Sequence, residues 1–90
     1  MTQLGVYILH CANGRYYIGS TDNLERRFNE HQNGHVKATQ YLLPVILKYF
    51  QPCASLTEAR KLEYQLKSKK SKIIIERIIQ EGYIKFNNHT

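Results

Sequence analysis

Two short apolar runs open the chain, and a turn sequence separates them. The first run covers residues 4–10 and the second covers residues 15–20, and both are rich in β-branched and aromatic side chains. Asn13-Gly14 lies between them and tolerates the positive φ angles of a tight turn. The pattern predicts an antiparallel hairpin that carries Tyr7 on its first arm and Tyr17 on its second.

A helical period follows the hairpin, and its limits are marked by capping residues. Asp22 and Glu25 have the spacing of a capping box, and Gly34 is suited to end a helix that runs to about Asn33. Projection at 100° per residue places an arginine and a histidine on the face that should meet the sheet. Arg27 could cover apolar neighbours with its stem while His31 is half-buried, or the two could line a site. That face carries Leu24, Arg27, Phe28 and His31.

The next segment supplies a third strand. Residues 35–43 show no clear period, and Pro44 ends this connection. Residues 45–50 are nearly continuous in apolar character, which predicts a strand that is central in the sheet or covered on both faces.

A second helix contains the strongest local anomaly in the sequence. Ser55 and Glu58 form a second capping-box pattern, and the helix is expected to run to about Lys67. Glu63 projects into the apolar stripe of this helix, where a carboxylate is costly unless it is paired or binds a metal. The alternatives are a salt bridge, with Arg27 as the candidate partner, and a metal ligand or general base. The stripe itself is Leu56, Ala59, Leu62 and Leu66.

Ser71 is placed to cap a third helix over residues 72–81, with Gly82 at its end. Its apolar face would hold four isoleucines. The expected fold is therefore α+β, with three strands, antiparallel or mixed, flanked by three helices in the order β-β-α-β-α-α. We expect one domain over residues 1–82 and a short tail over residues 83–90. The four isoleucines are Ile74, Ile75, Ile78 and Ile79.

Composition adds a bias toward polyanions. The 90 residues include 13 Lys and Arg against 7 Asp and Glu, a formal charge of +6, which favours nucleic acid as a partner. There is no apolar run long enough for a membrane span and no secretory signal pattern. Cys11 and Cys53 are expected to be free thiols in the reducing cytoplasm. The lysines at the end of the second helix and just after it are either solvated or bind phosphates: Lys67, Lys69, Lys70 and Lys72.

Together these features resemble the GIY-YIG nuclease superfamily. Gly5-Val6-Tyr7 and Tyr17-Ile18-Gly19 match the two tripeptides of its name, with Val6 in place of isoleucine. The likeness covers roughly residues 4–80. It is closest to small stand-alone bacterial members and to the N-terminal domain of excinucleases. No separate DNA-binding domain is expected to follow.

The resemblance implies a phosphodiesterase that uses one divalent metal ion, Mg²⁺ or Mn²⁺. Tyr7 would activate or orient the attacking water, and Tyr17 would position that water and the scissile phosphate. Arg27 would contact the phosphate, and His31 would occupy a position of proton relay. Glu63 would bind the metal. An arginine and a metal ion nearby would favour the phenolate of Tyr7.

Three functions follow from this reading. The first is a metal-dependent endonuclease acting on DNA, for example in DNA repair on branched, nicked or single-stranded forms. The second is a nucleic-acid-binding module that has the nuclease fold but little turnover unless a partner supplies specificity. The third is a protein-interaction unit. Strand alternation adds a structural condition for a site, since Tyr7 and Tyr17 must share a face and Tyr16 must lie on the other.

Overall fold

A computed structural model describes residues 3–84, which form three strands and three helices. The order is β-β-α-β-α-α, so the predicted α+β class and element order are confirmed. None of the helices in this part of the chain is long and apolar enough to cross a membrane. The elements are β1 (Gly5–Cys11), β2 (Tyr16–Thr21), α1 (Leu24–Gln32), β3 (Val45–Pro52), α2 (Leu56–Lys69) and α3 (Lys72–Glu81).

The sheet is antiparallel throughout, and its order is β2-β1-β3. β1 is therefore the central strand and β3 is an edge, so the first of the two alternatives predicted for residues 45–50, a central strand, was wrong. The register between β1 and β3 shifts at Ile8/Leu9, where Leu47 pairs with Leu9, Tyr49 pairs with Ile8, and Lys48 is the extra residue of a bulge. The bulge reverses the alternation within β3. The nearly continuous apolar run of β3 therefore does not imply that the strand is buried on both faces.

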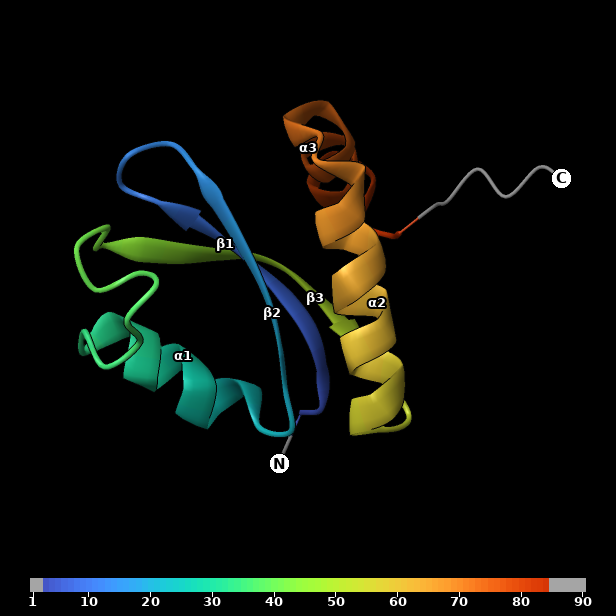
Figure 1. Ribbon diagram of the computed structural model, residues 1–90, viewed down its shortest axis with the longest axis horizontal. Coiled ribbons are helices and arrows are strands. Elements are labelled where there is room, and N and C mark those ends of the chain that lie inside the picture. Colours follow the sequence, from blue (N-terminus) through green and yellow to red (C-terminus); the bar gives the residue numbers. More distant parts are fainter. Residues whose placement is uncertain (1–2, 85–90) are drawn as a thin grey trace, which may run out of the picture.

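The central strand supplies both layers of the core. Val6 and Ile8 point to one face, and Tyr7, Leu9 and Cys11 point to the other. All five are at most 2% exposed, which is the burial expected of a strand covered on both sides. The first face is covered by α2 and α3, and the second by α1 with the connection that follows it (Figure 1).

Side-chain caps fix the start of each helix. The N-cap of α1 is Asn23, whose side chain accepts from the backbone N–H of Arg26. Asp22 was predicted to make the capping box, but it forms an ion pair with Arg26 at 2.6 Å instead. Ser55 and Ser71 cap α2 and α3 as predicted.

The second helix is one half-turn longer than predicted and sets the position of the third. α2 reaches Lys69, and its C-cap Lys70 has a left-handed φ of 50°. α3 contributes the buried Ile75 and Ile78 to the core on the face covered by α2, and Gly82 ends it at a φ of 81°. Ile84 packs against the same core, and the remainder of the predicted tail, residues 85–90, lies outside the described residues.

Candidate active site

Tyr7 and Tyr17 lie on the same face of the sheet, the face covered by α1. Their ring centroids are 6.2 Å apart, and the ring of His31 from α1 is 5.5 Å from Tyr7 and 5.1 Å from Tyr17. Tyr16 packs with the opposite core, in agreement with strand alternation. The two tyrosines and the histidine thus form one aromatic cluster between β1, β2 and α1.

The hydroxyl of Tyr7 is held by a buried chain of hydrogen bonds. Tyr7 Oη is 2.9 Å from His31 Nε2, and His31 Nδ1 is 2.8 Å from Thr39 Oγ1. All three side chains are at most 1% exposed. Burial, followed by the positive charge of Arg27, lowers the pKa of His31 to about 4. His31 is therefore neutral at pH 7, and one ring nitrogen donates while the other accepts.

The glycines of both tripeptides are needed for close packing. A Cβ at Gly19 would overlap the hydroxyl end of Tyr7, which lies directly against the β2 backbone at this position. A Cβ at Gly5 would overlap the carbonyl oxygen of Gln51 on β3. Gly19 therefore makes the space in which the hydroxyl of Tyr7 meets His31.

Arg27 lies beside this hydroxyl at the rim of the cluster. Its guanidinium is 3.1 Å from Glu30 Oε1, and its side chain is 36% exposed, so this ion pair contributes little stability. Burial raises the pKa of Tyr7 to about 12, although a hydrogen bond from Arg27 acts in the opposite direction. The arginine alone therefore does not favour the phenolate, because the cost of burying the charge is larger.

Glu63 reaches the site from the other side of β2. Ser20 Oγ donates to Glu63 Oε1, and Lys67 Nζ donates to Glu63 Oε2, each at 2.5 Å. The expected ion-pair partner, Arg27, is engaged with Glu30 instead. Lys67 is four residues away on the same helix, which is the favourable spacing for a glutamate and a following lysine.

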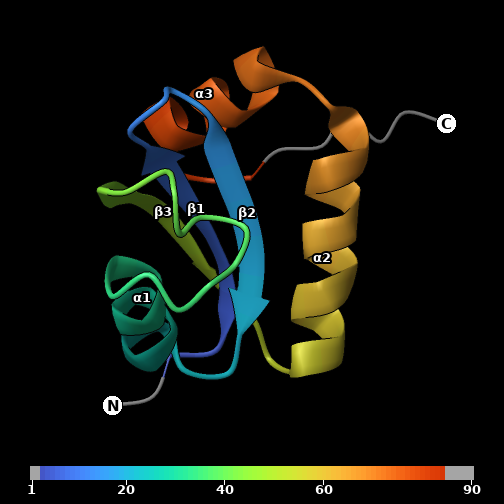
Figure 2. The same cartoon turned by 60° about the vertical axis from the view of Figure 1, so that its left-hand side comes forward.

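The edge of β2 is where the two layers meet. Lys67 Nζ is 6.0 Å from the centroid of the Tyr17 ring, and the negative charge of Glu63 acts on Tyr7 by raising its pKa. In Figure 2, β2 runs between α1 on one side and α2 on the other. Tyr7, Tyr17, Arg27 and Glu63 are thereby brought together around the edge of a single strand.

The donors at this edge suit a lightly coordinated hard cation. Residues 3–84 contain no group of three or more His, Cys, Asp and Glu that could hold a metal. Mg²⁺ keeps several waters and is commonly bound by one or two carboxylates together with substrate phosphates. The carboxylate of Glu63, with the Ser20 hydroxyl beside it, fits that mode of binding, provided that Lys67 leaves Oε2.

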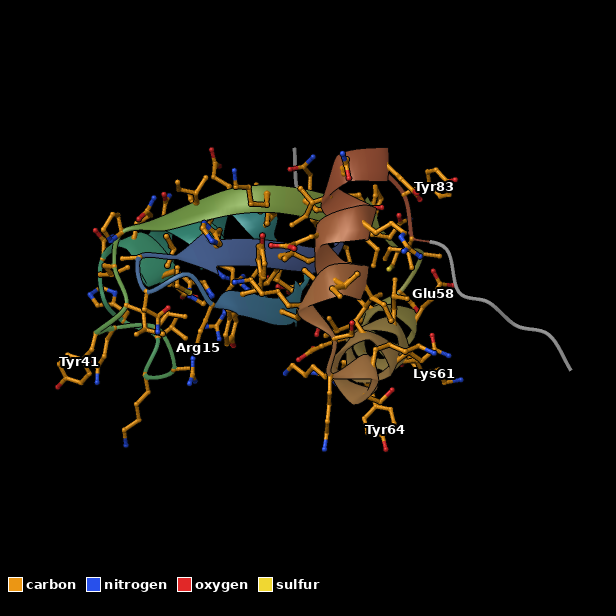
Figure 3. All side chains as sticks on the ribbon, turned by 90° about the horizontal axis from the view of Figure 1, so that it is seen from above. Arg15, Tyr41, Glu58, Lys61, Tyr64 and Tyr83 are labelled. Carbon is orange, nitrogen blue, oxygen red and sulfur yellow. The ribbon has the colours of Figure 1, made fainter. Side chains whose placement is uncertain are left out.

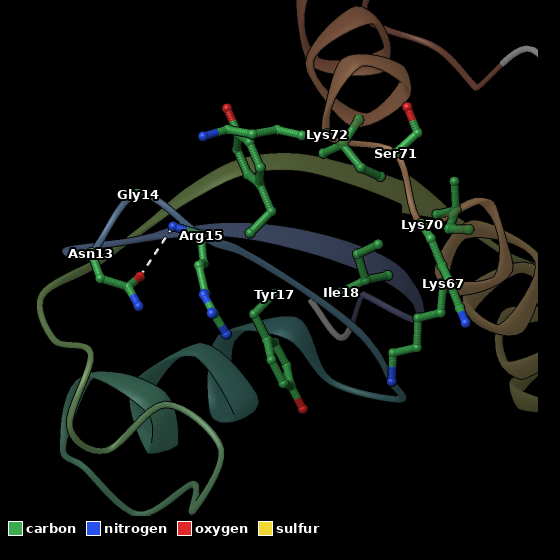
Figure 4. A pocket seen from close by; sticks show the side chains of 12 residues that line it. Asn13, Gly14, Arg15, Tyr17, Ile18, Lys67, Lys70, Ser71 and Lys72 are labelled. Carbon is green, nitrogen blue, oxygen red and sulfur yellow. Dashed lines mark hydrogen bonds between the residues drawn. The ribbon is translucent and has the colours of Figure 1, made fainter.

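Three of the four lysines that were predicted to bind phosphates line one pocket. Lys67, Lys70 and Lys72 line a pocket of about 480 Å³ between the hairpin and the junction of α2 with α3 (Figure 4). Lys69 is not among the residues that line it. Three of the four predicted lysines therefore line the same pocket, and Tyr17 lines it too.

Several residues at the site were not found from the sequence. Ser20 follows the second tripeptide directly, and a hydroxyl next to a motif glycine was an available indication. Thr39 comes from an aperiodic connection that offered no indication of contact with α1. Glu30 is not on the predicted inner face of its helix, yet its carboxylate pairs with Arg27.

Comparison with known proteins places these features in a family. The model of the GIY-YIG catalytic domain matches residues 3–77. A UPF0213 protein of Desulfotalea psychrophila is 43% identical over 65 residues, which cover 69% of this chain and 58% of that protein. UPF0213 proteins of Streptococcus pneumoniae and Bacillus licheniformis are 46% and 40% identical, over 72% and 83% of this chain and 67% and 77% of theirs. No solved structure matches the chain. The chain belongs to the GIY-YIG catalytic domain family.

Proposed function

We propose that this protein is a metal-dependent endonuclease that hydrolyses phosphodiester bonds in DNA, with residues 1–82 as its catalytic domain. The observation that supports this most strongly is the gathering of Tyr7, Tyr17, Arg27 and Glu63 around the edge of β2, from both layers of the fold. An aromatic hydroxyl, a guanidinium and a carboxylate are the groups that phosphodiester hydrolysis requires. The free cysteines fit a reducing compartment such as the cytoplasm.

Arg27 is proposed to bind the phosphate that is cut. A guanidinium offers planar paired donors that match phosphoryl oxygens, and these bonds strengthen as negative charge develops. Its partial exposure and its weak pair with Glu30 leave it available to a substrate. Tyr17, whose ring borders the same edge, would orient the phosphate beside it.

Tyr7 is proposed to orient the attacking water. With a pKa of about 12 it is a neutral phenol at pH 7, so its hydroxyl can donate one hydrogen bond and accept others. His31 is proposed to hold that hydroxyl in place, since its low pKa makes it a weak proton acceptor. In this role His31 is a positioning residue, and it would act as a relay if substrate binding raised its pKa.

Glu63 is proposed to hold one Mg²⁺ or Mn²⁺ ion. When bound, the ion would polarise the phosphate and lower the pKa of a bound water. Ser20 would fix the carboxylate by its hydrogen bond to Oε1. Lys67 would move from Oε2 toward the substrate, where its ammonium can meet a phosphate.

A nucleic-acid-binding module with little turnover by itself is the second candidate. The observation in its favour is that Lys67 is paired with the carboxylate of Glu63 and that burial keeps the hydroxyl of Tyr7 protonated. In that case a protein partner would supply specificity and activate the domain.

Incubation with DNA separates the two candidates. The purified protein is mixed with branched, nicked and single-stranded DNA, with Mg²⁺, Mn²⁺ or EDTA, and the products are resolved on a denaturing gel. The nuclease proposal predicts cleavage of at least one substrate with metal and none with EDTA. Salt-dependent binding to all substrates without cleavage of any would favour the binding module.

A further inference from the structure

Two basic pockets lie along the edge of β2, and each is lined in part by residues of the candidate site. β2 forms an edge of the sheet, because the strand order is β2-β1-β3. The smaller pocket is at its end, by Ser20 and Asp22, and the larger is at its start, by Arg15 and Tyr17. Ser20 and Arg27 line the smaller pocket, and Tyr17 and Lys67 line the larger. The arrangement suggests a path for a chain of phosphates.

The smaller pocket is basic and could hold the cut phosphate at Arg27 and its neighbour at Arg60. It encloses about 190 Å³, below the range of roughly 300–1,000 Å³ that holds drug-sized ligands. Arg26, Arg27 and Arg60 line it, against Asp22 as the acid among its lining residues. Arg26 pairs with Asp22, and Arg27 pairs with Glu30. Arg60 makes no hydrogen bond or ion pair within the part of the chain that the structure describes.

The larger pocket has the size and lining of a nucleotide site. Its volume is about 480 Å³, and its described lining includes four cations and no acid. Lys67 is paired with Glu63, and Lys72 Nζ is 5.9 Å from the Tyr16 ring centroid. The side chains of Arg15 and Lys70 have no partner among residues 3–84. In Figure 4 the side chains of Arg15 and Tyr17 lie next to each other and point in the same direction.

We propose that one strand of nucleic acid runs along the β2 edge, with a phosphate at Arg60 on one side of the cut phosphate and a nucleotide at Arg15 and Lys70 on the other. The position of the cut phosphate rests on the proposed function. β2 covers Tyr16–Thr21, and five steps of ~3.3 Å give a length of about 17 Å. At the ~3.4 Å repeat of a stacked strand, this length corresponds to about five nucleotides.

Phosphate scanning tests this path. A fluorescent single-stranded oligonucleotide is prepared as a series in which one phosphate at a time is replaced by a neutral methylphosphonate. Binding is measured by fluorescence anisotropy in EDTA for the wild type, Arg60→Gln and Arg15→Gln. Each variant is expected to lose about fivefold in affinity and to become insensitive to replacement at one position. The insensitive positions should differ and should lie on opposite sides of the cleavage site.

Lys61→Gln is the matched control. Lys61 is next to Arg60 on the same helix and points away from the sheet (Figure 3). Arg60→Gln should lower the salt dependence of binding by about 0.7 in the log–log slope, and Lys61→Gln should leave it unchanged. Equal losses in the two, or one shared insensitive position for Arg60→Gln and Arg15→Gln, would overturn the proposed path. If the wild type fails to cut DNA with metal while two separate positions persist, the nuclease proposal fails and the path stands.

Discussion

Acidification should destabilise the protein through His31. The ring is fully buried and bonded to Tyr7 and Thr39, and its pKa is lowered from 6.5 to about 4. A histidine whose pKa is depressed on folding binds a proton more readily in the unfolded chain. Its contribution to stability is therefore complete above pH 6.5 and is lost as the pH falls toward 4.

The size of the effect follows from the same values. The difference between 6.5 and about 4, at about 1.4 kcal/mol per pH unit, gives a loss of about 3 kcal/mol in the free energy of unfolding. Small domains are stable by roughly 5–15 kcal/mol, so this is a large fraction of the total. Asp and Glu side chains in general also titrate in this pH range. Their contribution to the loss of stability is separated from that of His31 by comparing variants.

Urea unfolding between pH 4 and pH 7.5 measures the loss, with circular dichroism as the probe. The wild type is compared with His31→Gln, which retains a polar side chain but cannot titrate, and with His35→Gln, which changes an exposed histidine. The slope of stability against pH should flatten in His31→Gln and stay as in the wild type in His35→Gln. Equal slopes in all three proteins would refute the assignment of the shift to His31.

Three further predictions concern the same site. Gly19→Ala should destabilise the protein by about 1–3 kcal/mol and reduce cleavage, because the new Cβ overlaps the Tyr7 hydroxyl; unchanged urea midpoint and rate would contradict this. Stability should fall by about 3 kcal/mol as the pH rises from 10 to 12, since burial raises the pKa of Tyr7 to about 12, and Tyr7→Phe should lack this loss in the same unfolding assay. Lys67→Gln should bind Mg²⁺ several-fold more tightly in isothermal titration calorimetry, because it frees Oε2 of Glu63; an unchanged or weaker affinity would show that Lys67 does not compete with the ion.

Much of the fold could be predicted because its signals are local. The Asn13-Gly14 turn, the serine caps at Ser55 and Ser71 and the period of the isoleucines each depend on a few neighbouring residues. The position of β3 could not be predicted in this way. Its bulge at Lys48 is a property of pairing with β1, and it reverses the alternation that would have marked a strand with one solvated face.

The proximity of the candidate site residues could be predicted from the sequence, but most of their contacts could not. The helical projection placed Arg27 and His31 toward the sheet, and the anomaly of Glu63 was visible as a charge in an apolar stripe. Arg27, on a different helix, was the candidate partner of Glu63 from the sequence. The actual partner is Lys67, which lies four residues further along the same helix. The phenolate of Tyr7 was expected because Arg27 lowers the pKa of this tyrosine. Burial raises that pKa by more, and the extent of burial cannot be read from residue types.

The most direct test of the account is the metal-dependent cleavage rate of Glu63→Gln beside that of Glu58→Gln. Both changes remove one negative charge from α2, and Glu58 is exposed and points away from the sheet (Figure 3). Single-turnover rates are measured with Mg²⁺ on a DNA substrate that the wild type cuts. We expect wild-type cleavage by Glu58→Gln and a loss of at least about 100-fold in Glu63→Gln. Cleavage by Glu63→Gln at a rate near that of the wild type would contradict it.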